Sequence, residues 1–340
     1  MLVSTMKKSS GAIGRLLLAT AAWGLSFPTA KAVMLAQAAL IPGREAWFHS
    51  ALILFVRMVL AAGLMFCLYS RECLRMGRNE LLQGLVLGAF GGVGMLLQTD
   101  AQHVIDASTS AFFTQFTCIF VPLVVALRSR VWPTPWVVLA SIMVLAGCAV
   151  LSGVSAGGVS FGMGEWETIA AAGLFTGQIL VLGSDRFKDN EMRSAATVMF
   201  AVKALLLAPV LFAGAGMGGS VQEGVAVTAQ VLAAFQSGHV LLMTGLLTVF
   251  STVYGYATMV RWQPLVSPVQ AGLIYATEPI FATLWALFLP GWFSTLGGLW
   301  YPNEVLGMPF FWGASLILGA NLLLLERKPR GEGPSNAGIG

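Results

Sequence analysis

The stretch VSPVQAGLIYATEPIFATLWALFLP, residues 266–290, is long and apolar enough to cross a bilayer, yet it carries Glu278 and Pro279 near its centre. A run of about 20 apolar residues spans the hydrocarbon core as a helix, because a helix satisfies all of its own backbone groups there. An acid within such a helix is expensive and is expected to face protein or water. Glu278 therefore marks a position where architecture or function requires a polar group.

The whole chain shares this apolar character, with 57% hydrophobic and 10% charged residues among 340. A soluble protein of this length would be far more polar. We therefore predict an all-α membrane protein with ten transmembrane helices. The ten apolar stretches are 14–38, 47–70, 80–99, 107–127, 134–153, 165–184, 194–214, 238–259, 266–289 and 305–325.

Lysine and arginine in the short loops orient these spans, because cytoplasmic loops carry an excess of both. With the N-terminus inside, the loop cations fall on the cytoplasmic side except Arg44. Both termini are therefore expected in the cytoplasm, in a bacterial-type inner membrane with lipid as its surroundings. The excess of cations in the cytoplasmic loops explains the net charge of +4. The sequence has no basic patch interleaved with aromatic residues, so nucleic-acid binding is not predicted.

Two segments in different halves of the chain indicate an internal duplication. LFVRMVLAAGLMF (54–66) aligns with FAVKALLLAPVLF (200–212), so that Arg57 matches Lys203. Transporters are often built from two related halves. Apolar segments align easily by chance, but a matched basic residue within equivalent spans favours duplication.

A second pair of segments matches Pro122 with Pro279. Because each half has five spans, an odd number, the second half enters the membrane upside down relative to the first. We therefore expect two inverted five-helix repeats, with a substrate site between them. The expected domains are a first repeat at 1–153, a Gly-rich linker at 154–164, a second repeat at 165–326 and a disordered cytoplasmic tail at 327–340.

Five segments together resemble the drug/metabolite transporter superfamily of EamA type. They are TAAWGLSFPTAK, LFVRMVLAAGLMF, TSAFFTQFTCIFVPL, TEPIFATLWALF and EVLGMPFFWGASLILGANLLLL, in the first, second, fourth, ninth and tenth spans. The resemblance covers nearly the whole chain. It implies a ten-helix carrier of two domains, whose members export amino acids, nucleosides, other metabolites or xenobiotics. The extended stretch at 290–303 departs from the family pattern.

Two readings of Glu278 stay open. In one, it contacts cargo or carries protons, because burial favours its neutral form. In the other it is architectural: Pro279 removes a helix hydrogen bond, and the carboxylate orders the freed backbone or pairs with a cation. Arg57 and Lys203 are likewise either a clamp for a substrate carboxylate or structural. In the structural reading, Lys203 extends toward the interface or Glu278 neutralises one of the two cations.

A wet, aromatic cavity is expected where the halves meet. For any one of its polar residues, a hydrogen bond between helices is the simpler explanation, but together they suit a small amphipathic metabolite. The candidate lining residues are Trp23, Ser26, Gln98, Gln115, Gln178, Tyr254, Tyr275 and Glu278, and the intramembrane charges are Arg57, Lys203 and Glu278.

Asp100, His103 and Asp106 have a spacing suited to metal binding, but Asp106 precedes a predicted helix, where capping is its expected role. We expect no metal and no cofactor, and no catalytic constellation indicates an enzyme. The leading hypothesis is a secondary transporter that exports small metabolites such as amino acids, passively or in exchange for protons. A flippase for a lipid-linked head group and a non-transporting scaffold or enzyme are the alternatives. The oligomeric state is not predicted.

Overall fold

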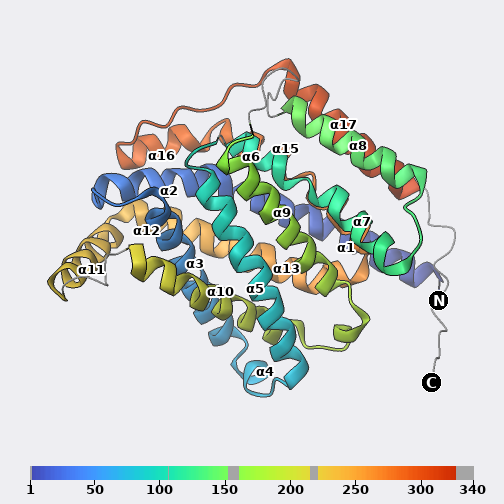
Figure 1. Ribbon diagram of the computed structural model, residues 1–340, viewed down its shortest axis with the longest axis horizontal. Coiled ribbons are helices and arrows are strands. Elements are labelled where there is room, and N and C mark those ends of the chain that lie inside the picture. The colour runs from blue at the N-terminus through green and yellow to red at the C-terminus, as the bar shows by residue number, and fades with distance from the viewer. Residues whose placement is uncertain (1, 106, 152–160, 215–220, 327–340) are drawn as a thin grey trace.

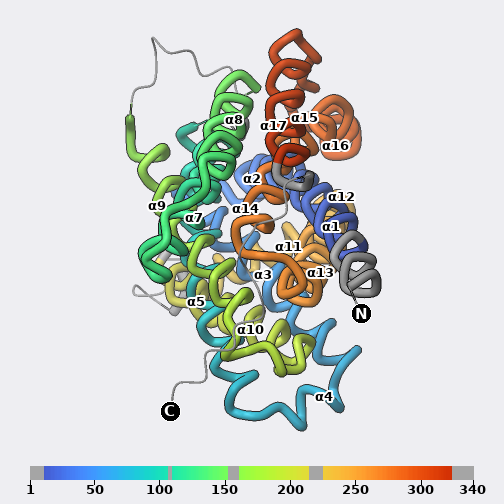
Figure 2. The backbone as a smooth tube through the Cα atoms, turned by 90° about the vertical axis from the view of Figure 1, so that its right-hand side faces the viewer, coloured from blue at the N-terminus to red at the C-terminus, as the bar shows by residue number. Residues whose placement is uncertain are grey.

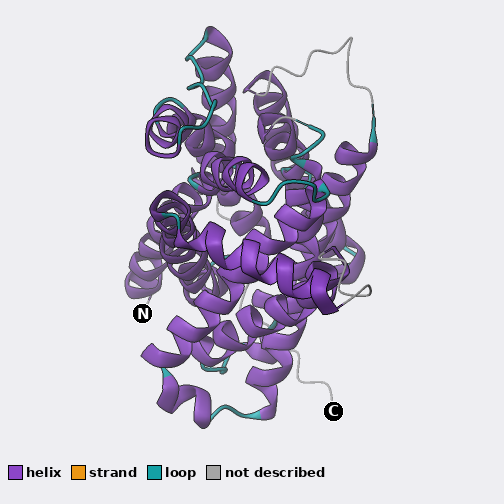
Figure 3. Ribbon diagram, turned by 90° about the vertical axis from the view of Figure 1, so that its left-hand side faces the viewer, coloured by secondary structure: helices purple, strands orange, loops and turns teal. Residues whose placement is uncertain are grey.

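The computed structural model describes residues 2–105, 107–151, 161–214 and 221–326. All regular secondary structure in these ranges is helical (Figure 1, Figure 3), as the composition predicts. The tail expected at 327–340 and most of the expected linker at 154–164 lie outside the described residues.

A helix or a broken helix occupies each of the ten predicted stretches. In chain order they are α1 (Leu2–Gly24) with α2 (Ser26–Leu40), α3 (Ala46–Leu68), α5 (Arg78–Ala101), α6 (Ala107–Thr114) with α7 (Thr117–Ser129), α8 (Pro135–Leu151), α9 (Met163–Leu182), α10 (Met192–Gly214), α12 (Gly238–Leu246) with a π-helical turn (Leu247–Tyr254) and α13 (Gly255–Trp262), α14 (Pro268–Tyr275) with α15 (Glu278–Ala286), and α17 (Met308–Glu326).

Not every one of these helices is long enough to cross a bilayer by itself. Among the described residues, six helical segments are long and apolar enough, and a bent pair formed by Pro268–Ala286 and Leu289–Gly297 makes a seventh. Of the remaining stretches, Pro135–Leu151 and Met308–Leu323 are apolar but shorter. Ten complete spans therefore stay a prediction.

Among the described residues, three α-helices lie mainly outside the predicted stretches: α4 (Ser70–Leu74), α11 (Val221–Gln236) and α16 (Leu289–Gly297). Helix α16 turns by 49° away from the ninth stretch and packs against α2 and α12. Its sequence begins with Leu289 and Pro290, and proline is well accepted in the first turn of a helix. The apolar character of residues 289–297 belongs to this extra helix.

Helices that the predicted repeat makes equivalent pack against each other. Helix α3 packs on α10, α7 on α14, and α8 on α17. Figure 1 shows α8 and α17 side by side along their length. Other contacts come in matched pairs. The packing of α5 on α9 is matched by that of α13 on α1, and the packing of α5 on α10 is matched by that of the π-helical turn on α3. Figure 2 shows the α3–α5 connection, with α4, at one end of the bundle.

Glycines bring α8 and α17 into backbone contact. A Cβ at Gly147 would lie 2.7 Å from the carbonyl oxygen of Gly313, and a Cβ at Gly313 would lie 2.5 Å from that of Gly147. In a bilayer the hydrophobic effect does not drive helices together, so close packing of small residues does much of this work. The pair therefore fixes how near the two helices lie.

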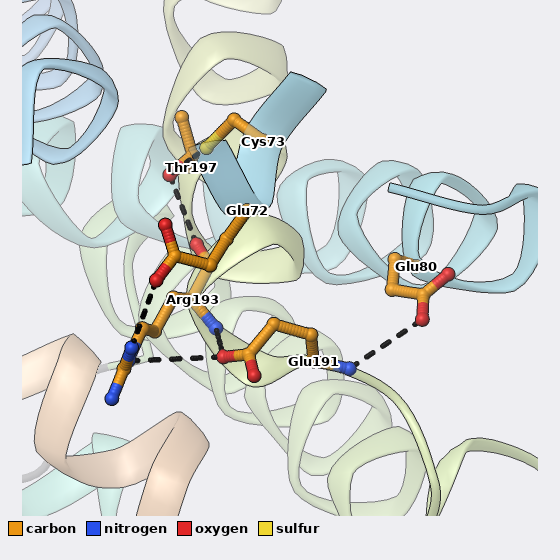
Figure 4. A network of polar contacts seen from close by, with 6 residues as sticks. All are labelled: Glu72, Cys73, Glu80, Glu191, Arg193 and Thr197. Carbon is orange, nitrogen blue, oxygen red and sulfur yellow. Dashed lines mark hydrogen bonds and ion pairs between the residues drawn. The ribbon is translucent and has the colours of Figure 1, made fainter. Parts of the chain in front are cut away.

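A polar network joins the start of α10 to the α4 region at the predicted cytoplasmic end (Figure 4). Arg193 Nη1 lies 3.1 Å from Glu72 Oε1, and Arg193 Nε lies 3.8 Å from Glu191 Oε1. The Glu191 N–H donates to Glu80 Oε1 at 3.5 Å. Because the paired side chains are 34–49% exposed, each ion pair contributes about 0–1 kcal/mol. The network orders the connection more than it stabilises the fold.

Replacing Gly147 by Ala should lower the thermal midpoint of the detergent-purified protein, because the new Cβ meets the Gly313 carbonyl. Overpacking of this kind costs about 1–3 kcal/mol. Gly173 in α9 is the matched control, since a Cβ there meets nothing within 4 Å. Circular dichroism melts should show a drop for Gly147→Ala and none for Gly173→Ala. Equal midpoints for the two variants would contradict the close contact of α8 and α17.

Candidate functional site

Glu278 is the first residue of α15, directly after a break in the ninth predicted span. Ala276 and Thr277 separate α14 from α15, and the Thr277 hydroxyl donates to the carbonyl of Ile274 at 2.7 Å. Glu278 makes no hydrogen bond among the described residues. Thr277 thus orders part of the backbone at this break, which is a task that the architectural reading gave to the carboxylate. Glu278 lies at the N-terminus of a short helix, where a negative charge is favoured.

Other spans near Glu278 are also irregular. Leu25 interrupts the first span between α1 and α2, three residues before Pro28, and Gln115 and Phe116 interrupt the fourth between α6 and α7. The eighth contains the π-helical turn (Leu247–Tyr254). In a bilayer, irregular backbone is tolerated where it is buried in protein or lines a water-filled cavity. These breaks therefore indicate where a cavity should be sought.

A cavity of about 100 Å³ lies among the breaks. It collects every predicted lining residue except Tyr254, together with Arg57. The predicted residues found there are Trp23, Ser26, Gln98, Gln115, Gln178, Tyr275 and Glu278, and the further polar or aromatic ones are Phe27, Thr99, Gln102, Thr114, Thr117, Phe175 and Tyr256. Side chains far apart in sequence thus meet at one place.

Tyr254 lies elsewhere, which corrects the prediction that it lines the cavity. Its side chain is 42% exposed and borders a separate hollow with Arg15 and Arg261 at the predicted cytoplasmic end. Tyr256, two residues further, lines the cavity instead. The π-helical winding that ends at Tyr254 alters which face each residue presents, and apolar periodicity alone does not reveal such a turn.

An aromatic group forms one wall of the cavity. The Trp23 ring lies 5.3 Å from that of Tyr256 and 5.1 Å from that of Tyr275, measured between centroids. The Tyr275 hydroxyl donates to Gln263 Oε1 at 2.9 Å, and Gln263 Nε2 donates to the Ile179 carbonyl at 2.7 Å. These contacts lie toward the predicted cytoplasmic side. They make that side of the cavity a packed, hydrogen-bonded layer.

Arg57 is buried in α3 and contacts the opposite half of the chain. Its Nε and Nη2 donate to the hydroxyl of Thr252 at 3.2 and 3.0 Å. The Thr252 hydroxyl in turn donates to the carbonyl of Leu247 at 3.0 Å. Nη1 has no hydrogen bond within the described part of the chain, so part of the guanidinium faces the cavity unpaired.

Lys203 lies behind the cavity wall and does not extend toward the interface, so that part of the sequence prediction is wrong. Its side chain is fully buried in α10. Nζ lies 3.8 Å from the ring centroid of Tyr256 and 3.5 Å from Sδ of Met95. The ion pairs found in the described ranges include none between Glu278 and Arg57 or Lys203, so the predicted neutralisation is absent from this conformation.

A wider vestibule of about 650 Å³ opens toward the predicted outer side. Gln102 borders both the vestibule and the central cavity, so the two are adjacent. Lys31, Arg44 and Glu165 are its charged lining residues. His103 lies within 2.7 Å of the Ser50 hydroxyl. Burial lowers the pKa of His103, opposed by the nearby Asp100 carboxylate.

Two residues of the metal-like spacing, Asp100 and His103, belong to the described part of the chain. Asp106 lies outside the described residues. Within the ranges that are described, no three histidine, cysteine, aspartate or glutamate side chains come together in a group that could hold a metal ion.

The described residues form a helical bundle with apolar helices of membrane-spanning length and a polar central cavity. Residues 11–153 match the model of the EamA-like transporter family, so the predicted family resemblance is confirmed for this region. Comparison with curated proteins gives no match.

Among solved structures, one titled "Crystal structure of protein" shares 18% sequence identity with this chain, with a TM-score of 0.62. The similarity covers 93% of this chain and 96% of that chain. At this identity the likeness concerns the fold alone. Its extent means that both predicted halves, including the part beyond the family match, follow a fold already seen in a crystal.

Replacing Lys203 by Met should raise the thermal midpoint, because a buried ammonium without a carboxylate partner is costly and an apolar chain of similar volume is not. Arg128→Gln, which removes an exposed cation at the end of α7, should leave the midpoint unchanged. A lower midpoint for Lys203→Met in circular dichroism melts would mean that the ammonium stabilises the fold on balance.

Proposed function

We propose that the protein is a secondary transporter that exports small amphipathic metabolites, such as amino acids and related compounds, across the inner membrane by alternating access. The observation that carries this proposal is the central cavity, because both predicted halves line it. Trp23 and Arg57 come from the first half, and Tyr256 and Glu278 from the second. Secondary transporters bind their substrates at such an interface. The EamA-like match over residues 11–153 supports the same class.

The proposed mechanism uses two inverted five-helix repeats, at 1–153 and 165–326. In such a repeat, each helix of one half has a counterpart in the other half. The contact of α5 with α9 then has its counterpart in the contact of α13 with α1, and the contact of α5 with α10 has its counterpart in the contact of the π-helical turn with α3. Each of these contacts is observed, and α3, α7 and α8 pack on their own counterparts. A two-fold axis between the halves produces such a pattern, which supports an inverted repeat.

The present conformation corresponds, in this mechanism, to a state open toward the outside. The vestibule adjoins the cavity at Gln102, whereas the hydrogen-bonded layer of Tyr275 and Gln263 lies on the opposite side. Release toward the vestibule is therefore sterically simpler than return to the cytoplasm. Rocking of one repeat against the other would open the Tyr275 side and close the vestibule.

The direct test is transport by the purified chain in liposomes. Counterflow of radiolabelled amino acids should be saturable and should need no ATP. Gly255→Leu should abolish it, since a Cβ at Gly255 would already lie 2.5 Å from Trp23 Nε1. Tyr254→Phe, outside the cavity, should transport normally. Thermal melts establish that both variants fold. Movement of lipid-linked head groups without free metabolites would favour a flippase, and folded protein with no flux would favour a scaffold or enzyme.

Glu278 is the candidate proton carrier in this proposal, because its carboxylate lines the cavity and has no ion pair among the described residues. Glu278→Gln keeps the shape and removes the titrating group. We expect the variant to retain counterflow but to lose acceleration by an imposed pH gradient. Equal acceleration of the wild type and Glu278→Gln would eliminate proton coupling through this residue.

A further inference from the structure

We propose that the cavity binds its solute through an anionic head group, a carboxylate or a phosphate ester, which Arg57 holds while Lys203 adds positive potential from behind. This inference names the substrate class of the transporter proposed above and rests on that function for its physiological meaning. Binding itself is measurable without transport, so the two claims can fail separately.

The unsatisfied part of Arg57 is the first observation. The guanidinium uses Nε and Nη2 to bond one hydroxyl, that of Thr252, which leaves the Nη1 donors without a protein acceptor in the described chain. Arginine stays charged at any physiological pH. A buried charge without a partner is costly, and such a group within a membrane bundle marks a substrate or ion pathway. An acidic oxygen in the cavity would supply the missing acceptor through charge-assisted hydrogen bonds.

Lys203 is the second observation. Its Nζ lies over the Tyr256 ring and contacts the Met95 sulfur. Neither of these groups carries a full negative charge. Both of these residues line the cavity. The ammonium therefore sits one side chain away from the space where solute would bind. When Lys203 is protonated, its potential is weakly screened in surroundings of low dielectric constant and reaches across that distance.

The balance of charge and of hydrogen-bond donors favours an anion. Arg57 and Lys203 are opposed in the cavity region by one acid, Glu278, which pairs with neither. Trp23 Nε1 is a buried donor at the cavity with no acceptor in the described residues. Hydrogen-bond donors thus outnumber the acceptors available to them on the side of the cavity formed by Trp23 and Arg57. The rings of Trp23 and Tyr275 offer apolar surface beside them, which suits the hydrocarbon part of an amphipathic acid.

The vestibule is compatible with the same charge. Lys31 and Arg44 line it against Glu165, so its described charged side chains carry an excess of one positive charge. A solute that leaves the cavity past Gln102 would therefore meet cations again. Potentials of this sign raise the local concentration of anions and guide them along a path.

The experiment compares solutes that differ in the head group alone. Butyrate, monobutyl phosphate, butyramide and butylamine form one set, and 4-phenylbutyrate, 4-phenylbutyramide and 4-phenylbutylamine form a larger one. Dissociation constants of the full-length, detergent-purified protein follow from ligand-dependent shifts of its thermal midpoint. We expect at least one acid in a set to bind about 10- to 100-fold more tightly than its amide and amine. The carboxylate and phosphate arms tell the two acid chemistries apart.

Variants assign the preference to residues. Arg57→Gln should remove the preference for the acid, Arg57→Lys should restore part of it, and Lys203→Met should weaken it. Arg128→Gln removes an exposed cation away from the cavity and should leave it intact. If Arg57→Gln fails to fold, Lys203→Met carries the test, since it keeps the packing volume. Tighter binding of the amide or amine, binding by no acid of either set, or an unchanged acid preference in the variants that fold would each overturn the proposal.

Transport measurements separate this proposal from the functional one. Anion binding without any flux would leave the binding site standing and remove the transporter. Flux that favours amines or amides would leave the transporter standing and remove the anion site.

Discussion

The guanidinium of Arg57 is the constraint on which the account of this molecule depends. It is held in an apolar helical bundle by a hydroxyl from the other half, that of Thr252. The same hydroxyl donates to Leu247 within the π-helical turn, so the irregular winding of the eighth span and the placement of the charge are linked. Neither the guanidinium nor the irregular backbone of the π-helical turn would be stable against lipid, because the bilayer core offers no water to form hydrogen bonds with them. A polar cavity beside Arg57 removes this conflict.

The broken helices follow from the same need. An unbroken helix consumes its own backbone donors and acceptors, whereas a break can direct side chains and backbone groups into a cavity. At one break the Thr277 hydroxyl donates to the carbonyl of Ile274, and Glu278 lies at the start of α15. In the first span, Leu25 lies at the break between α1 and α2, close to the cavity residues Trp23 and Ser26. Architecture and site are therefore two consequences of the same breaks.

Much of the cavity was predictable, because a polar residue in an apolar run has few favourable locations. Gln98, Gln115 and Gln178 stand out in this way, and all three line the cavity. Gln102 was missed because it follows the end of α5, where glutamine is ordinary. The prediction named Tyr254 and not Tyr256. The π-helical winding that precedes Tyr256 depends on tertiary contacts that the sequence pattern does not contain.

The fold class was predictable from hydropathy, and its finer features were less so. The sequence places Lys203 within a span but does not show its surroundings, which are the Tyr256 ring and Met95 once the helices are packed. Helix α16 continues the apolar run of the ninth span, so hydropathy alone does not mark the 49° bend. Pattern reasoning locates apolar segments well, and tertiary packing decides where each of them turns.

Cysteine accessibility tests most directly whether a watery chamber lies between the halves. In a background with Cys67, Cys73, Cys118 and Cys148 replaced by alanine, Ser26→Cys would be labelled in oriented vesicles with a membrane-impermeant thiol reagent. If a watery chamber lies between the halves, Ser26→Cys is labelled from the vestibule side, which opens past Gln102, and labelling is slower when solute fills the cavity. A Ser26→Cys protein that is folded but unreactive from both sides of the membrane would contradict the presence of this chamber.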